Sequence, residues 1–178
     1  MDNLAEKWKK LTFHGFDQAE YGKKHGAWEE AAKKLIDHLE EGINCGLVAD
    51  TAAGKTIIAL LAIYALEKRT LFLTPQRLLA EQHHELTGKM DGDNFRSSII
   101  HGHTSRKKRV WNDLADQIIF ATPHVVMEDF QKKIFSFKDF QVVVFDEMYR
   151  ATGDYPYVPL AKLANDNQLL AFGLTASP

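Results

Sequence analysis

Short apolar segments alternate with helical patterns along most of this chain, and this alternation constrains the fold more than any other feature. The apolar segments lack the polar residue at every second position that marks a strand with one exposed face, so they are typical of strands buried on both faces of a sheet. Strands joined through helices need crossover connections, which predict an α/β fold with a mostly parallel central sheet and helices on both faces. The strand candidates are residues 43–49, 70–74, 98–101, 117–121, 141–146 and 169–175.

Apolar residues at helical spacing separate these strands. Residues 27–39 form one such pattern, and Gly42 follows it as a stop signal. We expect residues 1–26 to form a short helix followed by irregular chain, an N-terminal extension of unclear role, and residues 27–178 to form the main domain. Further helices are predicted over residues 56–66, from Pro75 through Leu78, Leu79, Gln82 and Leu86, from a cap at Thr104 or Ser105 to Leu114, and from Pro123.

Composition excludes several classes of protein. The chain has 178 residues and a hydrophobic fraction of 45%, which suit one domain with a full core and argue against disorder. Its single cysteine cannot form an internal disulfide, so we expect a reducing, intracellular location, cytoplasmic or nucleoid-associated. No apolar run approaches the roughly 20 residues that span a bilayer, and we expect no membrane partner. The formal charge of −2 means that binding of a polyanion must come from a local patch.

The segment Ala-Asp-Thr-Ala-Ala-Gly-Lys-Thr, residues 49–56, follows a strand and opens a helix. Small residues here let successive backbone N–H groups surround phosphate oxygens, and the helix N-terminus adds partial positive charge. In such a loop Lys55 reaches the β- and γ-phosphates of ATP, and the Thr56 hydroxyl binds Mg²⁺. Glycine is usual where Ala49 stands, so a small-residue turn with a chance Gly-Lys-Thr is the alternative. The predicted ATP-binding residues are Thr51, Ala52, Ala53, Gly54, Lys55 and Thr56.

An acidic pair, Asp146 and Glu147, follows the apolar residues 142–145. An acid at the tip of a buried strand beside a phosphate loop holds Mg²⁺ through its water molecules, and the adjacent acid polarises the attacking water. Acids are also common at solvated strand ends, so the pair gains its meaning from the phosphate loop earlier in the chain. We therefore assign catalytic roles to Lys55, Asp146 and Glu147, and expect Thr56 and Asp146 to hold Mg²⁺.

With both motifs in place, the sequence resembles the first RecA-like domain of superfamily 2 DEAD/DEAH-like helicases, and within them the Hef/FANCM group of fork-processing DNA translocases. The resemblance rests on TPQRLLAEQ at residues 74–82, ATPH at 121–124, DEMYRATGDYPY at 146–157 and GLTASP at 173–178. It implies a RecA-like P-loop NTPase fold of three layers, ATP and Mg²⁺ as cofactors, and an ATP-dependent helicase or translocase acting on branched or duplex DNA. It also implies a second RecA-like domain, absent from this chain, so we expect the isolated domain to be monomeric and nearly inactive.

The resemblance further implies which residues contact nucleic acid and which couple hydrolysis to domain movement. Motors that track a backbone bind phosphates through hydroxyl and N–H groups at loop tips, without reading sequence. The predicted nucleic-acid contacts are Thr74, Pro75, Gln82, Gly102, Thr104, Arg106, Thr122 and Pro123. The predicted coupling residues are Tyr149, Arg150, Thr175 and Ser177. Arg106 opens a basic run, residues 106–109, whose alternative interpretation is a solvated helix face.

Three positions depart from the family pattern. Asp50 and Ala52 stand where the family prefers Pro and Gly, and an extra acid near a triphosphate weakens its binding. Tyr149 stands in place of a histidine and cannot act as a switchable cation. A degenerate module that binds nucleotide or nucleic acid without turnover is therefore one alternative, and a motor acting on RNA is another. A small P-loop kinase would not need the elements at 74–82 and 173–178.

The remaining chemistry-bearing side chains receive structural interpretations. The histidine pairs at 83–84 and at 101 and 103 lack further ligands at a zinc-binding spacing, so we assign no metal to them. We predict that the three tryptophans, Trp8, Trp28 and Trp111, are packing anchors in helical segments. Residues 155–157 are expected to form an aromatic turn. Arg150 is a candidate for a salt bridge that orders the same loop, and a solvated side chain is the alternative.

Overall fold

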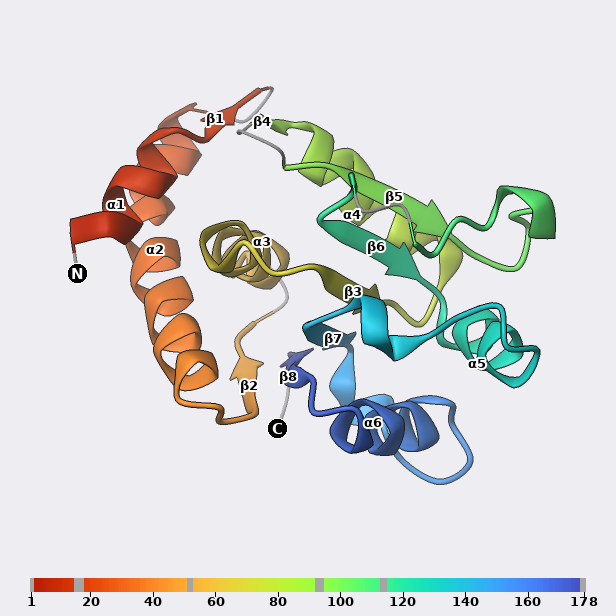
Figure 1. Cartoon of the computed structure of the whole chain (residues 1–178). Coiled ribbons are helices and arrows are strands. Elements are labelled where there is room, and N and C mark those ends of the chain that lie inside the picture. Colours follow the sequence, from red (N-terminus) through yellow and green to blue (C-terminus); the bar gives the residue numbers. More distant parts are fainter. Residues whose placement is uncertain (1, 15–17, 51–52, 92–94, 113–114, 177–178) are drawn as a thin grey trace.

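The predicted α/β fold is confirmed: the centre of the protein is a six-stranded sheet in which every neighbouring pair is parallel (Figure 1). The computed structural model describes residues 2–14, 18–50, 53–91, 95–112 and 115–176. The spatial order of the strands is β2-β8-β7-β3-β6-β5. Their bounds are β2 Cys45–Val48, β3 Thr70–Leu73, β5 Ser97–Ile100, β6 Ile118–Ala121, β7 Val142–Asp146 and β8 Leu170–Thr175.

Alternate residues of the central strands face two separate hydrophobic cores, because successive side chains of a strand point to opposite faces. On β3, Phe72 faces one core while Leu71 and Leu73 face the other. On β7, Val144 faces the first core and Val143 the second. The sheet is therefore the middle of three layers, as the sequence predicts.

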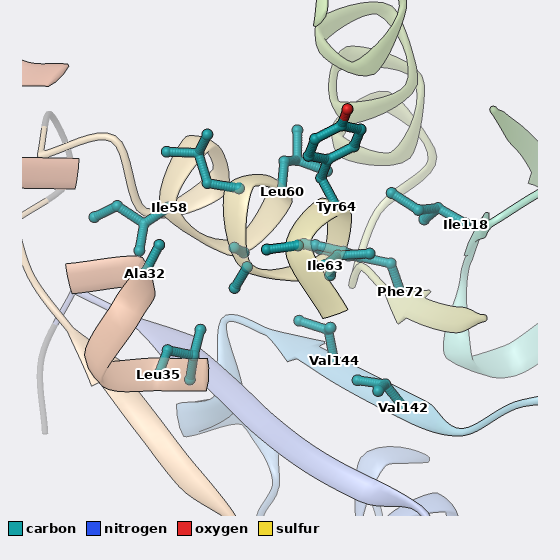
Figure 2. Packing of buried hydrophobic residues seen from close by; sticks show 14 of the residues in the cluster. Ala32, Leu35, Ile58, Leu60, Ile63, Tyr64, Phe72, Ile118, Val142 and Val144 are labelled. Carbon is teal, nitrogen blue, oxygen red and sulfur yellow. The ribbon is translucent and has the colours of Figure 1, made fainter. Parts of the chain in front are cut away.

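The first core lies between the sheet and the helices α1 to α4. The helix α3 (Lys55–Leu66) is apolar around nearly its whole circumference and is buried between the sheet and α2 (Gln18–Glu40), as expected of a helix without a polar face. Figure 2 shows Ala32 and Leu35 of α2 on one side of α3, with Val142 and Val144 of β7 beneath it. The other two helices on this side are α1 Asp2–Lys9 and α4 Arg77–Gly88.

The second core lies on the opposite face, beneath α5 (Pro123–Gln131) and α6 (Tyr157–Asp166). α6 was not predicted, because residues 155–157 suggested a turn rather than the start of a helix. The described residues also contain three short 3₁₀ turns: η1 Arg106–Lys108, η2 Phe137–Asp139 and η3 Met148–Arg150. Among the described residues, none of the helices has both the length and the apolar character needed to cross a bilayer.

Two expectations about the N-terminal part are wrong. α2 begins at Gln18 rather than at residue 27, so part of the expected irregular chain is helical. The strand predicted over residues 43–49 is not buried on both faces: β2 lies at the sheet edge, and its second and fourth residues, Gly46 and Val48, are exposed. In contrast, the prediction that Trp8 is a packing residue is confirmed. Trp8 is buried, and its indole Nε1 donates to the carbonyl of Leu61, so this hydrogen bond joins α1 to α3.

The basic helix expected from residue 104 or 105 to Leu114 is also wrong. Only the single turn η1 forms there, and Leu114 lies outside the described residues. The reason is tertiary: Arg109 and Trp111 both turn inward to the buried carboxylate of Asp129, which a continuous helix exposed to solvent would not allow. A short antiparallel pair, β1 (Thr12–Phe13) with β4 (Met90–Asp91), closes the N-terminal side.

Candidate nucleotide and nucleic-acid site

All strands of the parallel sheet end on the same side of the molecule, which we call the carboxyl edge of the sheet. The predicted site residues follow these strand ends. Val48 of β2 lies beside Thr175 of β8, and Asp146 of β7 lies beside Leu174 of β8. The Ala49 N–H continues the pairing by donating to the carbonyl of Thr175 at 3.2 Å. With β8 between them, β2 and β7 are separated by about 9–10 Å, twice the spacing of neighbouring strands.

The phosphate loop leaves β2 and enters α3 through Gly54, which has a φ of +83°. A Cβ at this position would lie 2.6 Å from the indole Nε1 of Trp28, so both the backbone conformation and the close approach require glycine. The same indole nitrogen donates to the carbonyl of Ala53 at 2.8 Å. Trp28 is therefore a packing anchor, as predicted, and it also supports the loop. Thr51 and Ala52 lie outside the described residues.

The Lys55 ammonium lies inside this loop. Its side chain is buried, and Nζ donates to the carbonyl of Ala49 at 2.7 Å and to that of Asp50 at 3.1 Å. Lys55 is also the first residue of α3, and a helix N-terminus favours an anion, which would compete with these carbonyls for the ammonium protons. Asp50, one of the three departures from the family pattern, is exposed to solvent.

The Asp146 carboxylate is buried at the tip of β7, and both of its oxygens are hydrogen-bonded. Oδ1 accepts from the N–H of Glu147 at 3.0 Å, and Oδ2 lies 2.9 Å from Nε2 of His83 on α4. Glu147 itself has a φ of 53° and a ψ of 50°, a left-handed conformation that costs a non-glycine residue about 1–2 kcal/mol. The sequence interpretation assigned His83 no role, since nothing local to it marks the partner 63 residues away.

This donor set fits Mg²⁺. Mg²⁺ is usually bound by one or two protein oxygens together with substrate phosphates, rather than by a cage of protein ligands. Asp146 offers a hard carboxylate with a fixed orientation, and Thr56 on the first turn of α3 offers a hydroxyl. Within the described part of the chain, no three His, Cys, Asp or Glu side chains form a cluster that would hold a metal without phosphate.

The buried hydroxyl of Tyr157, at the start of α6, also reaches this edge. It lies 2.7 Å from the carbonyl oxygen of Asp146 and 3.0 Å from that of Leu73. Burial raises the pKa of Tyr157 well above its ordinary value, so the hydroxyl remains a donor at any physiological pH. It joins the end of β7 to the end of β3, a role that the expected aromatic turn did not include.

The predicted nucleic-acid residues follow β3, β5 and β6, and backbone bonds hold their loops side by side. The Thr74 N–H donates to the carbonyl of Ala121, and the Thr122 N–H to that of Ile100. Thr104 accepts from the His101 N–H through its hydroxyl oxygen. The structure thus brings most of the predicted contacts to one edge, although they differ in exposure. Gln82, Gly102 and Arg106 are exposed, Thr104 and Thr122 are half-buried, and Thr74 and Pro123 are buried.

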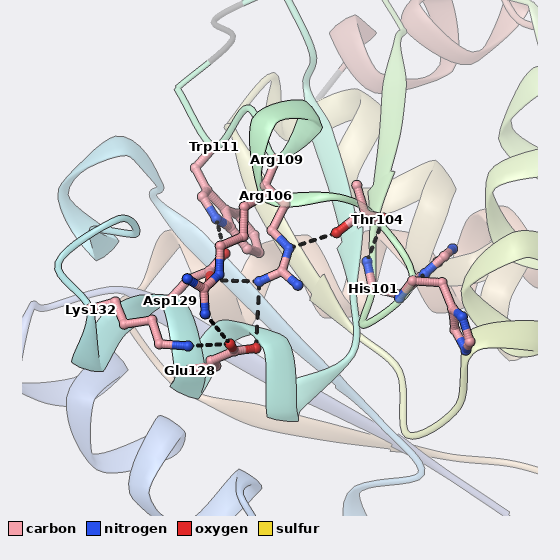
Figure 3. Close-up of polar contacts among 9 residues, drawn as sticks. His101, Thr104, Arg106, Arg109, Trp111, Glu128, Asp129 and Lys132 are labelled. Atoms are coloured by element: carbon pink, nitrogen blue, oxygen red, sulfur yellow. Dashed lines mark hydrogen bonds and ion pairs between the residues drawn. The ribbon is translucent and has the colours of Figure 1, made fainter.

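The basic run at residues 106–109 does not present four cations to solvent (Figure 3). The Arg109 guanidinium is buried, donating to Asp129 Oδ1 at 2.7 Å and to the Thr104 carbonyl at 2.9 Å. Arg106 is exposed and pairs with Glu128 at 3.2 Å. Hydrogen bonds from Lys132 and Arg106 lower the pKa of Glu128 to about 2. Arg109 therefore positions the Thr104 loop, and only the rest of the run faces solvent.

The predicted coupling residues lie around η3 and the end of β8. The Tyr149 ring is half-exposed, with the Arg150 guanidinium 5.3 Å above it. The salt bridge expected of Arg150 is wrong for the described residues, and its buried Nε finds no hydrogen-bond partner among them. Thr175 is buried, while Ser177 lies outside the described residues. Met148 packs against Gly46 and Gly173, where a Cβ would collide with it.

Comparison with known proteins agrees with this geometry. A profile of the DEAD/DEAH box helicase family matches residues 29–172. The ATP-dependent DNA helicase MPH1 of Kluyveromyces lactis is 32% identical over 149 residues, which is 79% of this chain and 14% of MPH1. MJ1505 of Methanocaldococcus jannaschii, provisionally named an ATP-dependent RNA helicase, is 33% identical over 136 residues, 74% of this chain and 17% of that protein.

Solved structures are similar as well. The Hef helicase domain of Pyrococcus furiosus is 29% identical and superposes with a TM-score of 0.69, covering 88% of this chain and 32% of the Hef chain. The structure of a hypothetical ATP-dependent RNA helicase from Sulfolobus tokodaii, 22% identical, shares the fold with a TM-score of 0.66 over 83% of this chain and 46% of that chain. This chain thus spans about one sixth of its curated relatives and one third of the Hef chain.

Proposed function

Because the chain belongs to the DEAD/DEAH box helicase family, within the Hef/FANCM group, we propose that it is the ATP-binding half of a nucleic-acid motor. The observation that supports this most is the arrangement at the sheet edge. The loop with Lys55 follows β2, and the acids Asp146 and Glu147 lie at the end of β7. A single strand, β8, separates the two, and its end carries Thr175. A triphosphate bound to the loop would therefore extend toward the acids.

Each residue of this edge has a distinct role in the proposed hydrolysis. Lys55 and the loop N–H groups bind the phosphates, and Thr56 and Asp146 hold Mg²⁺. Bound Mg²⁺ would supply positive charge to the phosphate oxygens. Glu147, which directly follows Asp146 at the end of β7, is proposed to orient the attacking water and accept its proton.

The nucleic acid is proposed to be DNA, branched or duplex. The relative MPH1 is named a DNA helicase, and the similar Hef structure is a helicase domain of the same group. The loops after β3, β5 and β6 would contact its phosphates. A second RecA-like domain is the proposed partner, supplying the arginine that in this mechanism is worth about 10³–10⁵ in rate. The 178-residue chain alone is accordingly proposed to be a monomer that binds ATP and hydrolyses it slowly.

Calorimetric titration of the chain with ATP, with and without Mg²⁺, tests the nucleotide site. We expect binding that is lost in Lys55→Ala. Lys68→Ala is the matched control, because Lys68 precedes β3 and therefore lies at the amino ends of the strands, away from the phosphate loop. Absence of binding by the unmodified chain would overturn the proposal and favour the degenerate module. In a full-length protein that contains this domain, Glu147→Gln should abolish turnover while preserving ATP binding, and forked DNA should stimulate turnover more than duplex RNA does.

A further inference from the structure

His83 is a buried histidine of α4, whereas Gln82, which precedes it, is exposed and His84, which follows it, is half-buried. Its side chain is 10% exposed, and its ring packs edge-on against Phe72, with centroids 5.4 Å apart. The ring of Phe120 lies 6.1 Å away. Two strands therefore fix the plane of the imidazole, and its Nε2 is directed at the Asp146 carboxylate.

The contact of His83 with Asp146 completes the hydrogen bonding of that carboxylate. Glu147 N–H binds one oxygen from within the same turn, which leaves the carboxylate free to pivot about that bond. The bond to His83, at 2.9 Å, fixes the second oxygen. A buried carboxylate oxygen that lost this donor would lose a charge-assisted bond and would rotate toward any other donor or toward water.

We propose that His83 is a positioning residue that holds the Asp146 carboxylate in one orientation for Mg²⁺ bound with the nucleotide. This inference rests on the proposed ATP-binding function. Groups that hydrogen-bond a metal-binding carboxylate orient it, and their loss typically reduces metal affinity by about 10- to 100-fold. His83 does so from α4, the helix that follows Thr74 and Pro75 and that carries Gln82, so the orienting group belongs to a predicted nucleic-acid-binding element.

The test measures the Mg²⁺ concentration needed for half-maximal binding of a fluorescent ATP analogue to the chain. His83→Leu keeps an apolar contact with Phe72 but removes the donor, and we expect it to raise that concentration by about tenfold or more. His83→Gln, which returns an N–H donor at a similar reach, should restore most of the affinity. His84→Leu is the matched control, since His84 lies on the same helix and contacts Ser97 instead of Asp146. Thermal unfolding of each variant checks that it is folded.

A second measurement needs no His83 variant. Imidazole ¹⁵N spectra of the unmodified chain should show a proton on Nε2 of His83, and Mg²⁺ with ATP should shift this resonance while leaving that of His84 unchanged.

Three outcomes separate the two proposals. If His83→Leu requires more Mg²⁺ and His83→Gln does not, the inference is supported. If His83→Leu binds like the unmodified chain and the His83 resonance does not respond, the inference is overturned and the proposed function stands. If the unmodified chain shows no Mg²⁺-dependent binding, both are overturned.

Discussion

The hydroxyl of Tyr157 lies within hydrogen-bonding distance of the Asp146 carbonyl, and through it the first turn of α6 is joined to the tip of β7. The same hydroxyl reaches the carbonyl of Leu73 at the tip of β3. These two strand tips lead, respectively, into the acidic pair and into the predicted nucleic-acid loop at Thr74. The carbonyl of Asp146 is therefore held by α6 while its carboxylate is held by α4.

Replacement of Tyr157 by phenylalanine keeps the ring and removes this link. We expect the free energy of unfolding to fall by about 1–3 kcal/mol, because two buried carbonyls lose their shared donor. Tyr155→Phe is the matched control, since the Tyr155 hydroxyl makes no hydrogen bond to a described residue and its ring packs edge-on against Tyr157. Urea denaturation measures both, and equal losses would contradict the role given to the Tyr157 hydroxyl.

Gly173→Ala and Gly46→Ala should lower the free energy of unfolding by different amounts, although the two glycines are paired in register on neighbouring strands. A Cβ at Gly173 would lie 2.8 Å from the Cβ of Met148, which cannot move unless the η3 backbone moves. A Cβ at Gly46 would meet only the flexible end of Met148, whose Cε is 2.8 Å away. We expect Gly173→Ala to cost about 1–3 kcal/mol and Gly46→Ala to cost well under 1 kcal/mol. Thermal or urea unfolding distinguishes them, and a larger cost at Gly46 would contradict this packing.

Loss of Arg109 should affect stability far more than loss of its neighbour Lys108. Arg109→Ala leaves the fully buried Asp129 carboxylate without its cation, which typically costs about 3–5 kcal/mol. Lys108→Ala removes an exposed side chain and should change the free energy of unfolding by less than about 0.5 kcal/mol. A larger loss of unfolding free energy in Lys108→Ala than in Arg109→Ala would contradict this assignment of Arg109 as the buried residue of the basic run.

The carboxyl of Glu128 should titrate with a pKa of about 2 in the folded protein, against an ordinary value of 4.5. Because the folded-state pKa is the lower one, its ion pairs stabilise the fold fully above pH 4.5 and lose their effect as the pH falls toward 2. Carboxyl ¹³C chemical shifts measure this titration. Lys132→Ala should raise the pKa more than Arg106→Ala, since the Lys132 hydrogen bond is the larger cause. High salt should weaken the effect at this exposed site.

Much of the fold can be predicted from the sequence because its signals are local. The short run of β-branched and aromatic residues at 142–145 favours a buried strand, and the apolar character of α3 around its circumference predicts a helix in the core. The prediction of a helix from residue 104 or 105 to Leu114 is wrong for the opposite reason. Local charge favoured an exposed helix, while the buried carboxylate of Asp129, 20 residues away from Arg109, drew the chain inward.

The sequence by itself determined most strands of the sheet, the loop with Lys55 that enters α3 and the place of the acidic pair at the end of β7, because residue types at short spacing decide strands, loops and strand ends. Only the tertiary structure decided what holds the Asp146 carboxylate in place and what joins α6 to the end of β3. His83 is 63 residues from Asp146 and Tyr157 is 84 residues from Leu73, yet each pair is joined by a hydrogen bond. Such partners depend on which strands become neighbours, and parallel crossovers bring together residues that no local pattern relates.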